Sequence, residues 1–226
     1  MSRSTDVRLL HDLPAVTVRA CSVSEMDNNV YLLTSTTTGA QVLIDAADDL
    51  EAVRGLLSSA AADTPCHTRL DAIVTTHRHW DHVRALAELA AEHDAVLYAG
   101  AEDADAIAEQ TGVEIDARLE HADTVGVAGI LLDVVGLRGH TPGSIAVVYE
   151  PGPDEAPVVF TGDSLFPGGV GNTDQDPERF TSLIDDVEAR LFDVYADDTH
   201  VHPGHGASTT LGAQRPQLPA WRERGW

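Results

Sequence analysis

Four short segments of this chain place histidine or aspartate where a predicted strand ends or a glycine turn begins. They are residues 76–82 (THRHWDH), 139–143 (GHTPG), 161–164 (TGDS) and 202–206 (HPGHG). With His202 left aside, these segments supply five imidazoles and two carboxylates. That number is enough for two adjacent divalent ions, because imidazole and carboxylate suit zinc, iron or manganese. The sequence therefore predicts a metal centre held by side chains from four distant loops.

The apolar runs predict an α+β fold. Strands are expected where β-branched or apolar runs are bounded by turn residues, at 15–20, 30–34, 41–45, 72–76, 95–98, 131–137, 145–149 and 158–161. Helices are expected at 50–59, 81–92, 102–110 and 177–191. Because strands are followed by a helix twice along the chain, we expect a four-layer αββα sandwich. A length of 226 residues suits a single domain over 1–226.

The composition restricts the class of partner. The net charge is −23 and all 14 basic residues are arginine, which argues against nucleic acid because phosphate binding depends on a basic surface. No segment near the N-terminus looks like a signal, and no run reaches the roughly 18 to 20 apolar residues of a membrane span. We therefore expect a cytoplasmic protein that acts on a small molecule, with no nucleic-acid or membrane partner. Cys21 and Cys66 are expected to be small buried hydrophobic side chains.

The segment 77–82 connects a predicted strand to a predicted helix and offers four ligands. His77 and His79 share parity in an extended stretch and so point the same way. Asp81 and His82 lie where the chain turns into the next helix. Four ligand-type residues among six are hard to explain as helix caps, so we expect this one loop to address two metal ions.

Three further candidates come from later turns. His140 lies between glycine and Thr-Pro-Gly, and His205 lies in Pro-Gly-His-Gly; a single histidine in such a turn is more often a solvated loop residue. Asp163 follows the apolar run 158–161, where an unpaired charge is costly and a metal ion neutralises it most simply. The joint occurrence of these three residues strengthens each of them as a metal ligand.

The pattern H-x-H-x-D-H, followed by Gly-His-Thr-Pro-Gly, Thr-Gly-Asp and Pro-Gly-His-Gly, resembles the metallo-β-lactamase-fold hydrolase superfamily in its glyoxalase II-like branch. The resemblance extends from about Asn29 to Gly206 and implies two divalent ions, with zinc as the first choice and iron or manganese as alternatives. It implies a first metal at His77, His79 and His140, a second at Asp81, His82 and His205, and a bridge by Asp163. The best-known antibiotic-hydrolysing members carry arginine where His82 stands and cysteine where Asp163 stands, or keep the histidine and carry serine at the bridging position. β-Lactam hydrolysis is therefore disfavoured.

This resemblance implies a metal-dependent hydrolase that cleaves a thioester or ester with a bridging hydroxide. Two metal ions about 3.5 to 4 Å apart lower the pKa of bound water toward about 7. Asp81 is the candidate to orient the hydroxide or relay a proton, and Asp163 is the second catalytic candidate. Trp80 alternates with the ligands, and we expect it to pack in the structure.

The substrate is expected to be small. Two-domain glyoxalase II, as the resemblance implies, carries a C-terminal helical domain with cationic side chains for glutathione. Here 21 residues follow His205, there is no lysine, and Asn172 stands where the family's G-x-G-R segment has arginine. A compact single-domain relative acting on a small thioester or ester fits these features better. Core or interface packing is expected for Trp221 and Trp226.

Three alternatives remain open. A persulfide dioxygenase shares these motifs, and that family implies one iron held by His77, His140 and Asp163, the facial arrangement of non-haem oxygenases. A nuclease of the same fold conflicts with the net charge of −23. A non-catalytic metal-bound module conflicts with seven ligands for two ions, because structural zinc sites are closed and usually tetrahedral.

Overall fold

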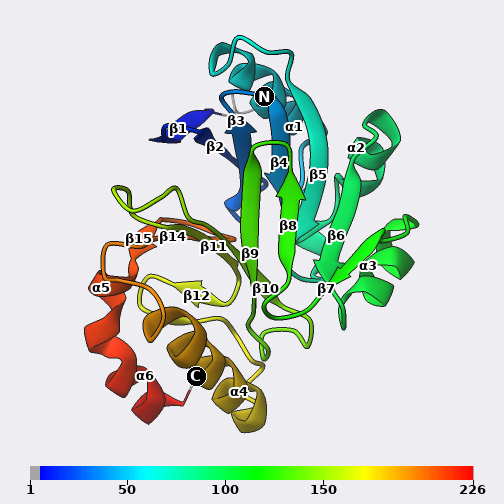
Figure 1. The fold of residues 1–226 in the computed structure, drawn as a ribbon. Helices are drawn as coiled ribbons and strands as arrows, with labels where there is room; N and C mark the ends of the chain where they lie inside the picture. The colour runs from blue at the N-terminus through cyan, green and yellow to red at the C-terminus, as the bar shows by residue number, and fades with distance from the viewer. Residues whose placement is uncertain (1–5, 226) are drawn as a thin grey trace.

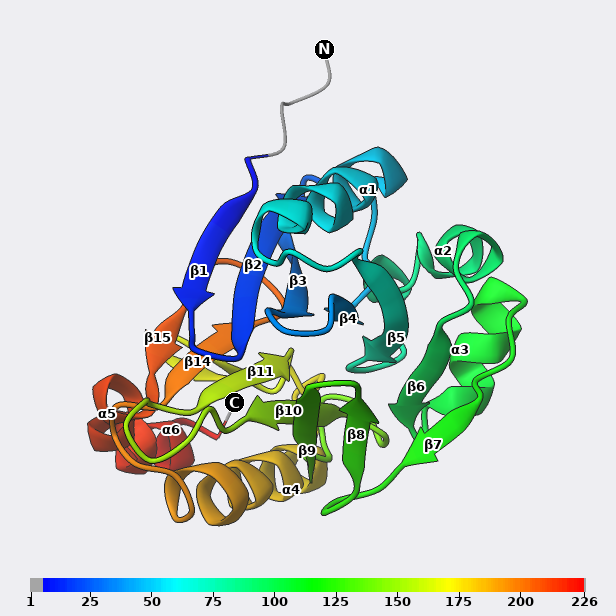
Figure 2. The ribbon, with the colours of Figure 1, turned by 45° about the horizontal axis from the view of Figure 1, so that its top comes forward.

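The computed structural model describes residues 6–225 and contains two facing β-sheets flanked by helices (Figures 1 and 2). The first sheet has the strand order β1-β2-β3-β4-β5-β6-β7 and comprises β1 (Arg8–Asp12), β2 (Val16–Val23), β3 (Asn28–Ser35), β4 (Ala40–Ile44), β5 (Arg69–Thr75), β6 (Val96–Gly100) and β7 (Ala117–Leu119). The second has the order β15-β14-β11-β10-β9-β8 and comprises β8 (Thr124–Val127), β9 (Ile130–Gly136), β10 (Ile145–Tyr149), β11 (Val158–Gly162), β14 (His200–Pro203) and β15 (Thr209–Thr210). A small hairpin pairs β12 (Leu165–Phe166) with β13 (Gly169–Val170).

Helices cover the outer face of each sheet. Against the first sheet lie α1 (Leu50–Ser59), α2 (Leu86–Glu92) and α3 (Ala104–Thr111). Against the second sheet lie α4 (Pro177–Val187), α5 (Leu211–Gln214) and α6 (Leu218–Arg224). The connecting short turns are η1 (Ala60–Ala62), η2 (Trp80–His82), η3 (Glu188–Phe192) and η4 (Arg215–Gln217).

Three apolar layers hold these elements together, and alternate residues of one strand belong to different layers. In β3, Val30 and Leu32 pack toward the helices, whereas Tyr31 and Leu33 pack between the two sheets. This follows from the pleat of a strand, whose successive side chains point to opposite faces. Since both faces of β3 are buried, the whole strand reads as apolar or uncharged. The predicted αββα sandwich is therefore confirmed.

Most predicted elements are present, and the differences have local causes. The helix at 50–59 and the strand at 145–149 have the predicted bounds. The predicted start of the helix over 81–92 is wrong, because α2 begins only at Leu86. Residues 80–82 instead form a 3₁₀ turn, in which the amide of His82 donates to the carbonyl of His79. The last turn of the helix expected to reach 191 is a π-turn, so α4 ends at Val187.

The two central pairs of parallel strands decide where the loops meet. Strand β4 runs parallel to β5, and β11 runs parallel to β14. The carboxyl ends of the two strands in each pair therefore lie at the same end of their sheet. Two backbone hydrogen bonds join the sheets at that end. The amide of Ile145 donates to the carbonyl of Thr76 (2.9 Å), and the amide of Asn29 donates to the carbonyl of Gly204 (2.7 Å). The segments that follow these strands therefore converge between the sheets.

The tryptophans and cysteines have separate outcomes. Trp221 is 1% exposed in the apolar layer beneath α4, so its expected core packing is confirmed, whereas Trp226 lies outside the described residues. Trp80 is 52% exposed with the guanidinium of Arg84 above its ring, so the expected packing of Trp80 is wrong. Cys21 is a buried free thiol and Cys66 a half-buried one.

Among residues 6–225, no helix is long and apolar enough to cross a membrane.

Candidate metal centre

Three imidazole nitrogens converge at the carboxyl end of β5. The Nε2 atom of His77 lies 3.1 Å from Nδ1 of His79, and Nε2 of His140 lies 2.9 Å from that same Nδ1. The pKa of His77 is held well below its usual value by burial and by repulsion from the neighbouring imidazoles. A neutral imidazole offers a lone pair to a metal ion, and three of them aimed at one point form the first donor set.

A second donor set lies beside the first. The Nε2 atom of His82 is 3.2 Å from Nε2 of His205 and 3.6 Å from Oδ2 of Asp81, which is itself 3.3 Å from Nε2 of His205. A tetrahedral ion with bonds of about 2.1 Å separates its ligands by about 3.4 Å. The distances between these donor atoms therefore fit a divalent ion.

Asp163 lies between the two donor sets. Its Oδ1 atom is 3.6 Å from Nε2 of His82, and its Oδ2 atom is 3.4 Å from Nε2 of His205 and 3.7 Å from Nε2 of His140. Oδ1 is buried and has no hydrogen-bond partner among the described residues. A buried carboxylate oxygen without a partner costs free energy, and a bridging cation would remove that cost.

The ionisation of the site favours a cation. Burial opposes the charge on Asp163, but His205, His82 and His140 outweigh it and lower the pKa of the carboxyl. Burial likewise lowers the pKa of His205, but the carboxylates of Asp163 and Asp81 outweigh it and raise the pKa to about 10. The proton on His205 and the two ionised carboxylates indicate that this set favours positive charge, and a metal ion bound there would replace that proton. Carboxylate and imidazole are donors that suit zinc, iron or manganese.

Buried side chains behind the donors set which ring nitrogen faces the centre. Asp45, 2% exposed, accepts a hydrogen bond from Nδ1 of His82 at 2.8 Å, which leaves Nε2 to face Asp163. In the same way Nδ1 of His140 donates to the carbonyl of Asn172 at 2.7 Å. The orientation of these two imidazoles therefore depends on a partner outside the donor sets.

Sequence reasoning missed three of these supporting residues. Asp45 carried a usable signal, because it directly follows β4 just as Asp163 directly follows β11. Asn28 donates from Nδ2 to Oδ2 of Asp81 at 2.9 Å, and nothing in its local sequence indicates this. Asp103 is fully buried and accepts hydrogen bonds from the amides of residues 78 and 143, which ties the loop after β5 to the turn that carries His140.

Close backbone packing explains two glycines at the site. A Cβ on Gly204 would lie 2.3 Å from Oδ1 of Asp163, and a Cβ on Gly171 would lie 1.8 Å from the carbonyl oxygen of the same residue. Only glycine allows this approach. The backbone therefore closes around Asp163 from two directions.

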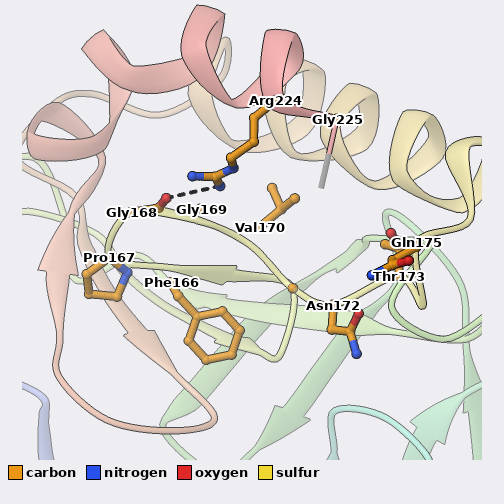
Figure 3. A pocket seen from close by; sticks show the side chains of 11 residues that line it. Phe166, Pro167, Gly168, Gly169, Val170, Asn172, Thr173, Gln175, Arg224 and Gly225 are labelled. Atoms are coloured by element: carbon orange, nitrogen blue, oxygen red, sulfur yellow. Dashed lines mark hydrogen bonds between the residues drawn. The ribbon is translucent and has the colours of Figure 1, made fainter.

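All seven ligand candidates come together, and His202 does not join them. They are His77, His79, Asp81, His82, His140, Asp163 and His205. His202 lies on β14 with its Nε2 atom 2.8 Å from Nε2 of His11, and its ring stacks on Phe160. Beside the donor sets, a cavity of about 800 Å³ opens between the β12–β13 hairpin and the end of α6 (Figure 3).

Comparison with known proteins places the chain in a family. The family described as the metallo-beta-lactamase superfamily matches residues 23–213. The hydroxyacylglutathione hydrolase GloC of Haemophilus influenzae is 32% identical over 165 residues, which are 66% of this chain and 75% of that protein.

Two solved structures are also similar. The structure of TTHA1623 in a di-iron-bound form is 32% identical with a TM-score of 0.65, and the match covers 86% of this chain and 95% of that one. The structure of ETHE1 from Myxococcus xanthus is 28% identical with a TM-score of 0.74, and the match covers 91% and 84%. The chain therefore belongs to the metallo-β-lactamase superfamily, and its relatives indicate a metal-dependent hydrolase.

Proposed function

We propose that this protein hydrolyses a small thioester or ester with two divalent metal ions held by the six side chains of the two donor sets and by Asp163. The observation that carries the proposal is the position of Asp163. Its carboxylate oxygens lie 3.4 to 3.7 Å from ring nitrogens of histidines in both sets. Its buried Oδ1 atom has no hydrogen-bond partner among the described residues. A carboxylate so placed suits a bridge between two cations.

The proposed ligands divide between two positions. His77, His79 and His140 would hold one ion, while Asp81, His82 and His205 would hold the other. When bound, such ions would lower the pKa of a water molecule and polarise the carbonyl group of the substrate. Zinc is the proposed metal, and iron is the alternative that the di-iron-bound form of TTHA1623 supports.

The chain's own side chains have defined tasks in this proposal. Burial raises the pKa of Asp81, but hydrogen bonds from His205 and Asn28 outweigh it, so the carboxylate stays ionised. Asp81 is the proposed residue to orient the attacking water or to relay its proton. The buried hydrogen bonds behind the imidazoles hold the donors in place, so little reorganisation is needed during the reaction.

A thioester is preferred over other carbonyl substrates because of the relatives. GloC is named as a hydroxyacylglutathione hydrolase, and its 32% identity supports an acyl thioester as the substrate class. A β-lactam is not proposed, since aspartate occupies position 163 and histidine position 82. We also propose that residues 1–226 act as one domain.

The alternative function is that of a mononuclear iron persulfide dioxygenase. His77, His140 and Asp163 would then hold one iron, and the similarity to ETHE1 of Myxococcus xanthus gives this reading some support. In that reading the second donor set, with its donor distances of 3.2 to 3.6 Å, would have no ion to bind. This is why the hydrolase is preferred.

One experiment separates the two functions. Protein purified without oxygen is analysed for metal content and then assayed on S-lactoylglutathione, another thioester, a simple lactone and glutathione persulfide. The proposal expects two metal ions per chain and hydrolysis of a thioester without oxygen uptake. One iron per chain together with oxygen uptake on the persulfide would refute it.

A further inference from the structure

Three of the six histidines outside the donor sets come together at a second place in the molecule. His11 lies on β1, the edge strand of the first sheet, whereas His200 and His202 lie on β14 of the second sheet. The end of β1 lies beside β14 and β15 (Figure 2). These three residues, the histidine cluster, therefore connect the two sheets at a place that the proposed reaction does not use.

The pleat of β14 directs two of these rings to one side. His200 and His202 are alternate residues of the strand, so their side chains point to the same face. Val201 between them packs on the opposite face, in the apolar layer beneath α4. The centroid of the His11 ring lies 4.6 Å from that of His200 and 5.1 Å from that of His202. One imidazole of the first sheet thus contacts two of the second.

The ring nitrogens of His11 and His202 face each other. Nε2 of His11 lies 2.8 Å from Nε2 of His202, close to the 2.9 Å between two ring nitrogens of the first donor set. The hydroxyl of Ser208 lies 2.6 Å from Nδ1 of His202, and a proton on that Nδ1 leaves the lone pair of Nε2 toward His11. The pair therefore has the arrangement that two imidazole ligands need.

The protonation of this pair also suits a cation. Burial and the nearby His200 lower the pKa of His11 to about 4, and burial with repulsion from neighbouring cations lowers that of His202 to about 3. Both rings are therefore neutral near pH 7 and offer lone pairs without losing a proton to solvent. On binding an ion, His11 moves its ring proton from Nε2 to Nδ1, and the two Nε2 atoms separate from 2.8 Å to about 3.4 Å.

We propose that the histidine cluster is a separate binding site for one divalent transition-metal ion of the kind that prefers imidazole, with zinc as the ion to test. His11 and His202 supply their Nε2 atoms, and the ring of His200 turns to supply a third nitrogen. The imidazole of His200 forms no hydrogen bond with residues 6–225, so no such bond opposes this rotation. The bound ion links β1 to β14.

This site binds its ion more weakly than the proposed hydrolytic centre does. Neutral imidazoles bring no negative charge, whereas Asp81 and Asp163 bring two ionised carboxylates to that centre. The guanidinium of Arg8 also repels positive charge at His202. The ion is therefore lost when excess metal is removed. Because the histidine cluster shares no residue with the donor sets, the inference does not depend on the proposed function.

Calorimetric titration with zinc chloride tests the site. Wild-type protein is first loaded with zinc and freed of excess metal, and it should then bind one further ion per chain with a rise in its unfolding temperature. His11→Gln, His200→Gln and His202→Gln should each weaken this further binding at least about tenfold. The metal content after the first loading should match that of the wild type in all three variants.

Two more variants separate a defined site from general effects. His67→Gln removes an exposed imidazole elsewhere on the surface and is the matched control, so it should bind the further ion as the wild type does. Ser208→Ala keeps all three imidazoles but removes the hydroxyl beside Nδ1 of His202, and it should weaken the further binding about tenfold. Because Ser208 is an exposed loop residue, this variant remains informative if His202→Gln does not fold.

The outcomes are distinct. A wild type that binds no further zinc overturns the assignment. Further zinc bound equally well by the wild type, His11→Gln and Ser208→Ala overturns it too, since the ion then lies elsewhere. An equal loss of affinity in His67→Gln and His11→Gln has the same consequence. If no thioester is hydrolysed but the variants of the histidine cluster lose the further ion selectively, the hydrolase proposal fails and this site stands.

Discussion

The Nδ1 atom of His82 lies 2.8 Å from Oδ2 of Asp45, and both side chains are buried. The same carboxylate accepts hydrogen bonds from the amide (2.7 Å) and the hydroxyl (2.8 Å) of Thr76. The acceptor at Nδ1 keeps the proton there and leaves the lone pair of Nε2 toward the second donor set. Asp45 thus determines the tautomer of a proposed ligand without belonging to either donor set.

Replacing Asp45 by asparagine should reverse that tautomer. Asparagine tolerates the positive φ of 58° at this position, so the backbone is expected to remain as it is. If the amide oxygen keeps the bond from the Thr76 amide, the amide nitrogen faces His82, whose Nδ1 must then accept while Nε2 carries the proton. Affinity for the second metal ion is expected to fall about 10- to 100-fold.

Competition with a chelator measures this loss, and circular dichroism checks the fold. Asp48→Asn is the matched control, because Asp48 lies three residues away and pairs with Arg84 at the surface. Metal affinity in Asp45→Asn equal to that of the wild type would show that the hydrogen bond to His82 does not control the ligand.

A pair of glycine substitutions tests how tightly the backbone closes around the centre. In Gly204→Ala the new Cβ would lie 2.3 Å from Oδ1 of Asp163 and 2.7 Å from Cε1 of His82, so both donors must move. Gly55→Ala makes the same chemical change on α1, where nothing lies within 4 Å of the new Cβ.

Metal content, turnover and the free energy of unfolding are measured for both glycine variants. Gly204→Ala should lose metal and turnover together, while Gly55→Ala should keep both and gain roughly 0.5 to 1 kcal/mol of stability in its helix. Normal metal binding in Gly204→Ala would contradict the packing described around Asp163.

Stability at mildly acidic pH should depend on the histidine pair that joins β1 to β14. Burial and the nearby His200 lower the pKa of His11 to about 4, and burial with repulsion from His11, His200 and Arg8 lowers that of His202 to about 3. A lowered pKa means that the folded state binds fewer protons than the unfolded one. The contribution is complete above about pH 6.5 and is lost as the pH falls toward 4.

Denaturant unfolding of the wild type and of His11→Gln between pH 7.5 and 4.5 measures this effect. On acidification His11→Gln should lose less stability than the wild type. One titrating group contributes at most about 1.4 kcal/mol per pH unit. Because His11 is only half-buried, the difference should stay below that value. The comparison between the two proteins removes the contribution of the other histidines. Parallel pH profiles would show that the His11–His202 pair does not oppose protonation.

Six of the seven proposed ligands were predictable because each lies in a short segment next to an apolar run, whereas His205 was predicted from the glycine turn that contains it. Asp163 follows β11 directly and His77 follows β5 after one residue. The carboxyl ends of parallel strands lie at the same end of a sheet, so such residues come close to the ends of neighbouring strands. Asp45 showed the same pattern with a single aspartate and was missed. Asn28 and Asp103 were not predictable, because their roles arise from contacts with loops 53 and 38 residues away in the sequence.

The strands that the sequence did not reveal are short or exposed. β1 is an edge strand that leaves most of its side chains exposed or half-buried, and β7 has only three residues. β14 reads as His-Val-His-Pro, which lacks an apolar run although three of its four residues are buried between other elements. Burial there follows from tertiary packing, which local sequence patterns do not report.

The metal content and turnover of Asp163→Ala test the central claim most directly. Asp154→Ala, at an exposed turn, is the control for loss of a carboxylate. After loading with zinc and removal of excess metal, the wild type and the control should retain two ions per chain. Asp163→Ala should fold normally, retain no more than one ion, and lose at least about 100-fold in kcat on the thioester substrate. Two tightly held ions and wild-type turnover in Asp163→Ala would contradict the account.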